Sequence, residues 1–269
     1  MKFFVAAACS AILCGGADLP RAAAPSGLEE GYRKMYNLQF DEAHRIFQQW
    51  QSDHPEDPMG PASEAAAYLF SELDRLHILQ SEFFTDDDHF AKKHKLSPDL
   101  KLKGRFQEEL ARAGSLAAEA RDEPNSMFAT IMQHGLQSDY LALIEKRYLP
   151  ALNETKQASA VAEKLLEMRP DYHDANLAIG VENYLLSLKP APVRWLLRAG
   201  GAQTDRQAGI EKLRLTEEKG HYLVPFAKIL LAVAALRDKN REAAEAELSW
   251  LAEQFPLNRL FREELAKLQ

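Results

Sequence analysis

Apolar side chains recur along the chain at intervals of three and four residues, a spacing that places them on one side of an α-helix. Ala43, Phe47 and Trp50 have this spacing. The pattern predicts an all-α protein with about eleven helices and no strands. The expected helices cover residues 26–37, 40–53, 58–83, 97–121, 125–149, 154–168, 172–187, 204–219, 222–237, 240–254 and 257–267, and a short additional helix covers residues 191–198.

Capping residues, glycines and prolines mark the expected helix boundaries. An N-cap oxygen accepts a hydrogen bond from a helix N–H group, and a Pro in the first turn removes a donor that the helix cannot pair. Asp57-Pro58 and Ser97-Pro98 have this form, while Ser26 with Glu29 and Thr204 with Gln207 form capping boxes. The expected helix stops are Gly200, Gly201, Gly220, Pro55, Pro170 and Pro256.

Three stretches of the chain share one arrangement of small, apolar and proline residues. The arrangement consists of Ala43, Phe47, Trp50 and Pro55, then Ala244, Leu248, Leu251 and Pro256, with a weaker copy in Ala158, Ala162, Leu165 and Pro170. Other helices place a small residue before an aromatic or apolar one, as in Gly31 and Met35, Ala65 and Tyr68, and Gly180 and Tyr184. In these positions the chain resembles the tetratricopeptide-repeat family.

The resemblance implies an α-solenoid of antiparallel helix pairs, in which a Gly or Ala lets two helices approach closely and an aromatic ring fills the groove beside it. The prolines that end the three units do not follow in steps of about 34 residues, so long helices and inserted segments are expected between the units. Residues 133–269 also resemble a group of uncharacterised exported bacterial repeat proteins. That resemblance carries no activity with it.

The amino-terminal segment has the order of a secretory signal peptide. Lys2 precedes an apolar run over residues 3–13, which small residues follow up to Ala24. The run is too short to cross a bilayer. We therefore expect a cleaved signal over residues 1–24 and a single helical-repeat domain over residues 25–269. Cys9 and Cys14 both lie in the signal, so the mature chain would contain no cysteine; the alternative is a lipid-modified Cys14, against which Leu13 counts.

Composition and charge narrow the range of partners. The chain is 46% hydrophobic and carries a formal net charge of −7, which offers no positive field for a nucleic-acid backbone. We therefore expect no nucleic-acid partner. The most apolar later run, over residues 222–236, contains Lys228 and has the length of a core helix.

Signals for catalysis, metals and cofactors are weak. The run Asp86-Asp87-Asp88-His89 lacks the alternating spacing and the turn Gly of a calcium loop, so a solvated capping cluster is the preferred interpretation. The basic stretch that follows, over residues 92–105, is interpreted as a solvated surface, and the alternative is a charged flap that docks an acidic partner. The chain has no nucleophile elbow, phosphate loop or dinucleotide fingerprint. We expect no catalytic residue, no bound metal and no cofactor, although Asp139 and Glu145 form a carboxylate pair whose proximity sequence cannot show.

Aromatic residues are the best candidates for partner binding. In a repeat array the first helices of successive pairs line a concave surface. The candidates on this surface and on the long helix before the Gly180 unit are Tyr32, Met35, Tyr36, Tyr140, Arg147, Tyr148 and Tyr184. Tyr and Arg are enriched at binding hot spots, but each tyrosine is also interpretable as a core residue that fills a groove. One subgroup of the tetratricopeptide-repeat family binds the C-terminal carboxylate of a partner with polar ligands at inward positions. Leu28 and Glu29 stand at the matching positions here, so binding of this kind is not supported.

A second candidate surface lies in the connection after the Gly180 unit. Trp195, Leu196 and Leu197 are flanked by Arg194 and Arg198. An apolar patch with arginines suits a peripheral membrane contact or a protein partner. Packing against a neighbouring repeat explains the same residues.

Three functions follow as hypotheses. The leading one is an exported, non-enzymatic scaffold of tetratricopeptide type that binds a protein or peptide in the cell envelope and is periplasmic or secreted. The alternative is a lipid-anchored or membrane-peripheral subunit of an envelope assembly, held by Cys14 or by the patch around Trp195. The third is a hydrolase, which two carboxylates facing one closed pocket would favour.

Overall fold

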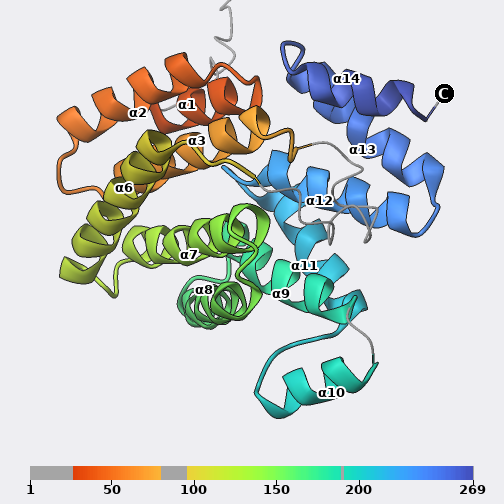
Figure 1. The fold of residues 1–269 in the computed structure, drawn as a ribbon. Coiled ribbons are helices and arrows are strands. Elements are labelled where there is room, and N and C mark those ends of the chain that lie inside the picture. Colours follow the sequence, from red (N-terminus) through yellow and green to blue (C-terminus); the bar gives the residue numbers. More distant parts are fainter. Residues whose placement is uncertain (1–26, 80–95, 189–190, 269) are drawn as a thin grey trace, which may run out of the picture.

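The computed structural model describes residues 27–79, 96–188 and 191–268, and within these ranges the chain is all-helical (Figure 1). The prediction of an all-α protein is confirmed for this part of the chain. Its twelve α-helices are α1 (Gly27–Tyr36), α2 (Phe40–Asp53), α3 (Met59–Arg75), α6 (Leu100–Glu119), α7 (Pro124–Asp139), α8 (Tyr148–Met168), α9 (Asn176–Ser187), α10 (Ala191–Ala199), α11 (Arg206–Lys219), α12 (Val224–Arg237), α13 (Arg241–Gln254) and α14 (Arg259–Ala266). A π-helical turn, η1 (Tyr140–Ile144), and a 3₁₀ turn, η2 (His173–Ala175), complete the set.

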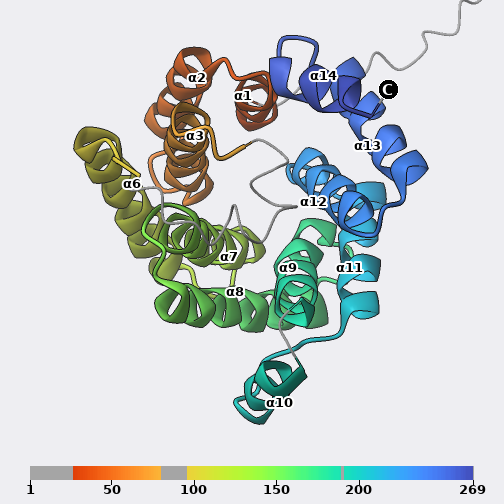
Figure 2. The ribbon, with the colours of Figure 1, turned by 45° about the vertical axis from the view of Figure 1, so that its right-hand side comes forward.

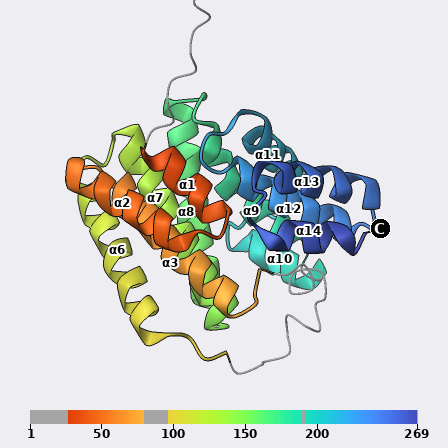
Figure 3. The same cartoon turned by 90° about the horizontal axis from the view of Figure 1, so that it is seen from above.

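Helices that follow one another in the chain also pack on one another. This holds from α1 to α9, and α9 then packs on α11, with α10 left out of the sequence of contacts. Figure 3 shows α1–α3 and α6–α8 on one side of the molecule and α9 with α11–α14 on the other. In Figure 2 the helices surround a common centre, so that α1 lies beside α14.

The first and last helices are joined by direct contacts. The Asn258 side chain donates to the Tyr36 carbonyl oxygen at 2.9 Å, and the Leu257 N–H donates to the Asn37 side chain at 3.1 Å. The Tyr36 ring also lies 5.5 Å from the Phe255 ring, measured between centroids. These contacts close the arc of helices into a ring.

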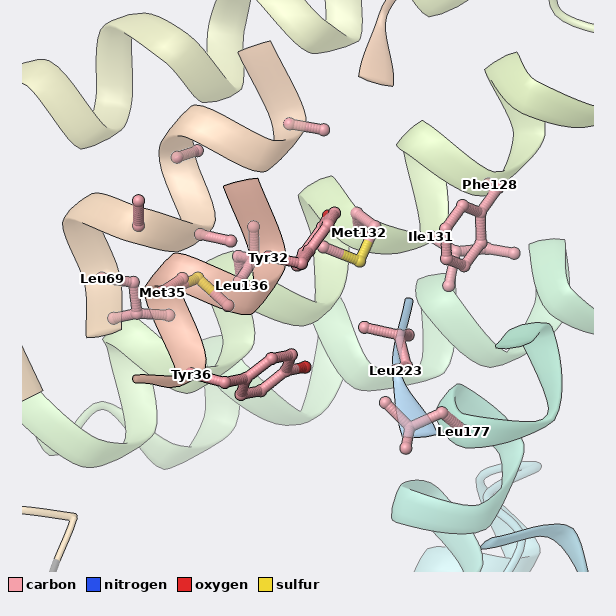
Figure 4. Close-up of a cluster of buried hydrophobic side chains, with 14 of the residues drawn as sticks. Tyr32, Met35, Tyr36, Leu69, Phe128, Ile131, Met132, Leu136, Leu177 and Leu223 are labelled. Carbon is pink, nitrogen blue, oxygen red and sulfur yellow. The ribbon is translucent and has the colours of Figure 1, made fainter. Parts of the chain in front are cut away.

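The centre of the ring is filled by apolar side chains from both halves of the chain. Figure 4 shows Tyr32 of α1, Met132 of α7, Leu177 of α9 and Leu223 turned toward one another. All four are buried. Burial of a side chain of this size contributes about 1.5–3 kcal/mol, so this cluster holds the two halves together.

Helices α9 and α11 cross with their backbones in contact. A Cβ atom on Gly209 would lie 2.6 Å from the backbone nitrogen of Tyr184 and 3.0 Å from the carbonyl oxygen of Gly180. On α1, a Cβ on Gly31 would overlap the buried Phe47 ring of α2. The close approach expected at Gly31 and Gly180 is therefore present, and Gly209 is the partner that the sequence pattern did not identify.

The helix predicted over residues 125–149 is broken, which corrects the sequence-based boundary. Helix α7 ends at Asp139, the π-helical turn η1 follows, and Lys146 has φ +56°. The next helix begins at Tyr148, six residues before its expected start. Pro150 explains the shift, because it has no N–H donor and is tolerated only in the first turn of a helix.

Candidate functional site

A buried carboxylate fixes the connection between α11 and α12. Asp174 accepts hydrogen bonds from the backbone N–H groups of His221 at 3.0 Å, Tyr222 at 3.1 Å and Leu223 at 3.1 Å. Burial raises the pKa of Asp174, and the backbone donors act in the opposite direction. A Cβ atom on Gly220 would lie 2.7 Å from Asp174 Oδ1 and still closer to the carbonyl oxygen of Thr216, so this position requires glycine. Asp174 thus fixes the position of the backbone of residues 221–223 against the rest of the ring.

A cleft of about 410 Å³ opens between this connection and the amino-terminal helices. Its lining comes from α1, the start of α3, the start of α7, the segment 171–174 and the segment 219–222. The volume falls within the range of about 300–1,000 Å³ that ligand pockets occupy. With Trp50 of α2, which also lines the cleft, six separate segments of the chain meet at one site.

Aromatic rings form the walls of the cleft. The Trp50 Nε1–H donates to Asp57 Oδ2 at 2.8 Å, and the Tyr172 hydroxyl donates to Asn125 Oδ1 at 3.2 Å. The third ring, Tyr222, packs 5.1 Å from the Tyr32 ring, measured between centroids. These bonds fix the orientation of the rings, so that they offer flat apolar surfaces beside polar groups.

The carboxylates of the cleft are engaged within the protein. Asp57 also accepts from the Met59 N–H at 3.0 Å, and Asp171 accepts from the Arg169 guanidinium at 3.0 and 2.9 Å. Burial, together with the negative charges of Asp174 and Asp57, raises the pKa of Tyr172 above its usual range. The exposed amino group of Lys219 lies at the rim.

A second hollow of about 250 Å³ lies on the other side of Tyr222. His221 and Tyr222 line both spaces, and Trp250 and Gln254 close the second one. Glu29 of α1 makes an ion pair with His221. This contact links α1 to the connection between α11 and α12, where the two hollows adjoin.

Five of the residues predicted to bind a partner are core residues. Their exposed fractions lie between 1% for Met35, Tyr140 and Tyr184 and 4% for Tyr36, with Tyr32 at 3%. The expectation that these side chains face an open concave surface is corrected, and the alternative interpretation as groove-filling residues fits their burial. Tyr32 and Tyr36 reach only the wall of the second hollow.

The physical reason is that neighbouring helices cover these side chains, and for Tyr36 the closing contact with the carboxyl-terminal half adds to this cover. The Tyr32 hydroxyl accepts a hydrogen bond from the Ser63 hydroxyl at 3.0 Å, and the Tyr36 hydroxyl donates to the Tyr222 carbonyl oxygen at 3.3 Å. Tyr140 stacks on Phe106 with centroids 5.0 Å apart. Each ring fills space between helices and offers no free face.

Arg147 and Tyr148 lie on the surface, unlike the other five candidates. The Tyr148 side chain is 47% exposed and its neighbour Leu149 is 81% exposed. Arg147 donates to Glu145 Oε2 at 3.3 Å. These residues are exposed because the chain breaks between α7 and α8, and Leu149 was not identified from the sequence.

The patch around Trp195 lies on α10, as the short predicted helix requires. Trp195 is 73% exposed and Val193 42% exposed, while Leu197 is partly buried. The backbone of Leu196 is part of α10, and the Leu196 side chain lies outside the described part of the structure. In Figures 1 and 2, α10 stands apart from the ring of the other helices.

The acidic cluster at Asp86–His89 lies outside the described residues, as do residues 92–95 of the basic stretch. Within the described ranges, no three His, Cys, Asp or Glu side chains lie close enough together to hold a metal ion. Burial raises the pKa of Asp139 to about 7. Burial also acts to raise the pKa of Glu145, but hydrogen bonds from Lys103 and Arg147 hold it below its ordinary value.

Comparison with known proteins gives no match. No protein-family model matches the chain, and neither a curated protein nor a solved structure is detectably similar to it. The tetratricopeptide resemblance therefore stays a prediction from the sequence. Within the described ranges, no helix combines the length and the apolar character needed to span a bilayer.

Proposed function

We propose that this protein is an exported, non-enzymatic helical-repeat scaffold that binds a protein or peptide partner in the cell envelope. Its repeats are of tetratricopeptide type and form a solenoid that bends into a ring. Three helix ends support this assignment, because Pro55, Pro170 and Pro256 each stand two residues beyond the last residue of α2, α8 and α13. Each of these prolines prevents the helix from continuing and allows the next unit to begin.

The cleft bounded by Trp50, Tyr172 and Tyr222 is the observation that carries the proposal. Fixed aromatic walls next to hydrogen-bonding groups suit a peptide, which offers both apolar side chains and backbone donors and acceptors. The carboxylates Asp57 and Asp174 are each held by hydrogen bonds from the protein itself. In the proposed function these two carboxylates shape a binding surface and take no part in acid–base chemistry.

Export rests on the sequence of residues 1–24. The apolar run with its flanking Lys2 and small residues is the support for a signal, and that segment lies outside the described residues. The partner would therefore be met in the periplasm or outside the cell. Sequencing the amino terminus of the protein recovered from the cell envelope tests this step, because a chain that retains Lys2 contradicts it.

The binding site can be tested with a photo-crosslinking amino acid at position 219, at the rim of the cleft. The matched control carries the same group at position 101, an exposed site on α6 outside the cleft. We expect a partner to be captured from position 219 only. A synthetic peptide that spans the captured segment should then bind the purified protein, and Lys219→Glu should change its affinity at least tenfold while Lys101→Glu leaves it unchanged.

Two results would contradict the proposal. Equal capture from positions 219 and 101, or equal affinity of the peptide for both variants, would show that the cleft is not the binding site. Catalytic turnover of compounds from a hydrolase substrate panel, abolished by Asp57→Asn, would show that the carboxylates do chemistry.

A further inference from the structure

The segment around α10 differs in charge from the rest of the chain. The whole sequence has a formal net charge of −7, yet the stretch from Asn183 to Thr204 contains no Asp or Glu. Arg194 and Arg198 both lie in this stretch, on α10. A local excess of positive charge on an acidic protein attracts an anionic surface.

The arginines of α10 are held by neutral groups. Arg194 Nη1 donates to the Ser187 carbonyl oxygen at 3.0 Å, and Arg198 Nε and Nη2 donate to the hydroxyl and carbonyl oxygens of Thr204 at 2.5 and 3.2 Å. Among the described residues, no carboxylate forms an ion pair with either arginine. Their guanidinium groups are therefore fixed in position, and within the described ranges they have no acidic partner.

The Trp195 ring of α10 is presented outward beside these charges. Trp195 is 73% exposed and Val193 is 42% exposed, and Arg198 is exposed as well. Because α10 stands apart from the ring in Figures 1 and 2, a flat surface can approach it without meeting α9 or α11 first.

We propose that α10 docks on an anionic lipid bilayer. The Trp195 ring enters the boundary between headgroups and acyl chains, where amphipathic rings are favoured, and Arg194 and Arg198 contact the lipid phosphates. Charge complementarity favours this occupant, since the exposed ring lies beside two arginines that pair with no carboxylate of the described residues, in a stretch of sequence without Asp or Glu. The proposal does not depend on the cleft, so a bilayer-bound protein would keep the cleft available to a partner.

Vesicle binding of the full chain tests the proposal. The probes are vesicles of phosphatidylglycerol and phosphatidylcholine in a ratio of about 3:7, and vesicles of phosphatidylcholine alone. We expect tighter binding to the anionic vesicles, reduced by added salt, and quenching of Trp195 fluorescence by brominated acyl chains. Trp195→Ser and Arg194→Gln/Arg198→Gln should each weaken the anionic binding at least tenfold. The amino-terminal apolar segment is the same in every variant, so differences between variants report α10.

Matched variants separate charge from structure. Arg194→Lys/Arg198→Lys keeps both charges and loses the guanidinium geometry, so it should bind within about threefold of the original chain. Lys101→Glu changes an exposed basic residue on α6 and should have no effect. Circular dichroism should give the same helix content for all variants. The proposal is overturned if Trp195→Ser binds as tightly as the original chain, if both vesicle types bind equally, or if the double Lys variant loses as much as the double Gln variant.

Discussion

Replacing Gly209 by Ala adds one methyl group at the crossing of α9 and α11. The added Cβ would meet the Tyr184 backbone nitrogen at 2.6 Å and the Tyr184 Cα and Gly180 carbonyl oxygen at 3.0 Å. Ordinary contacts of a Cβ atom begin at about 3.4 Å. The atoms in the way belong to the backbone of α9, so a side-chain rotation cannot relieve the overlap and the whole helix must move.

Two effects of opposite sign determine the magnitude. Overpacking of a close-packed core costs about 1–3 kcal/mol, and here α9 must separate from α11 along a buried crossing. Ala in place of Gly in a helix contributes about 0.5–1 kcal/mol of stabilisation. We therefore expect a net loss of about 1–2 kcal/mol, which lowers the melting temperature by about 3–8 °C for a domain of this size.

Gly104 supplies the matched control for this measurement. It lies within α6, is exposed, and a Cβ atom there would meet nothing within 4 Å. Gly104→Ala should therefore raise the melting temperature by about 1–4 °C, because only the helix preference changes. Thermal unfolding followed by circular dichroism measures both variants.

The sign of the difference is the decisive result. If Gly209→Ala is as stable as Gly104→Ala, the two helices do not cross in backbone contact, and the role assigned to Gly180 and Gly209 is wrong. A double variant Gly180→Ala/Gly209→Ala that is no worse than either single variant would indicate one shared contact instead.

Three other predictions concern single side chains. Asp139 has a folded-state pKa of about 7 against an ordinary value of 3.8, so the folded state keeps a proton that the unfolded state has lost, and stability should fall as pH rises from about 4 to 7. Asp139→Asn should abolish this fall and be about 2–3 kcal/mol more stable than the original protein at pH 8. If urea unfolding gives the two proteins the same dependence of stability on pH, the raised pKa of Asp139 is refuted. Gly220→Ala should destabilise by about 1–3 kcal/mol, because its Cβ would overlap the Thr216 carbonyl oxygen and Asp174 Oδ1, and an unchanged urea midpoint would refute these contacts. Glu29→Gln should cost less than about 1 kcal/mol, because its partner His221 is more than half exposed, so a larger loss would show that this ion pair holds the ring closed.

Helix positions could be predicted from the sequence because local signals determine them. Pro55, Pro170 and Pro256 stop the preceding helices, and the apolar spacing gives the buried sides. The break after Asp139 was missed because the apolar pattern continues through it, and only Pro150 indicated the new helix start. A proline in the first turn and one inside a helix look alike when no cap residue accompanies them.

The cleft could not be predicted in the same way, because it depends on contacts between distant segments. Asp174 is a buried anchor for residues 221–223, which lie 47 to 49 positions later in the chain, and neither segment has a local motif. The burial of Tyr32 and Tyr36 likewise depends on the closing contact with Tyr222 and Asn258. A periodic pattern shows that a side chain faces inward, but not whether a later helix covers it.

Because the first helix contacts the last, the chain cannot complete its fold until its synthesis is nearly finished. Tyr36 meets its partner Asn258 across 222 positions, so the amino-terminal helices leave the ribosome long before the segment that completes their burial exists. An open repeat array can fold progressively from one end, but contacts at this separation slow the final step. The nascent chain therefore has a long interval in which its tyrosine-bearing surface is uncovered, and a shortened protein that ends before Tyr222 would remain in that condition.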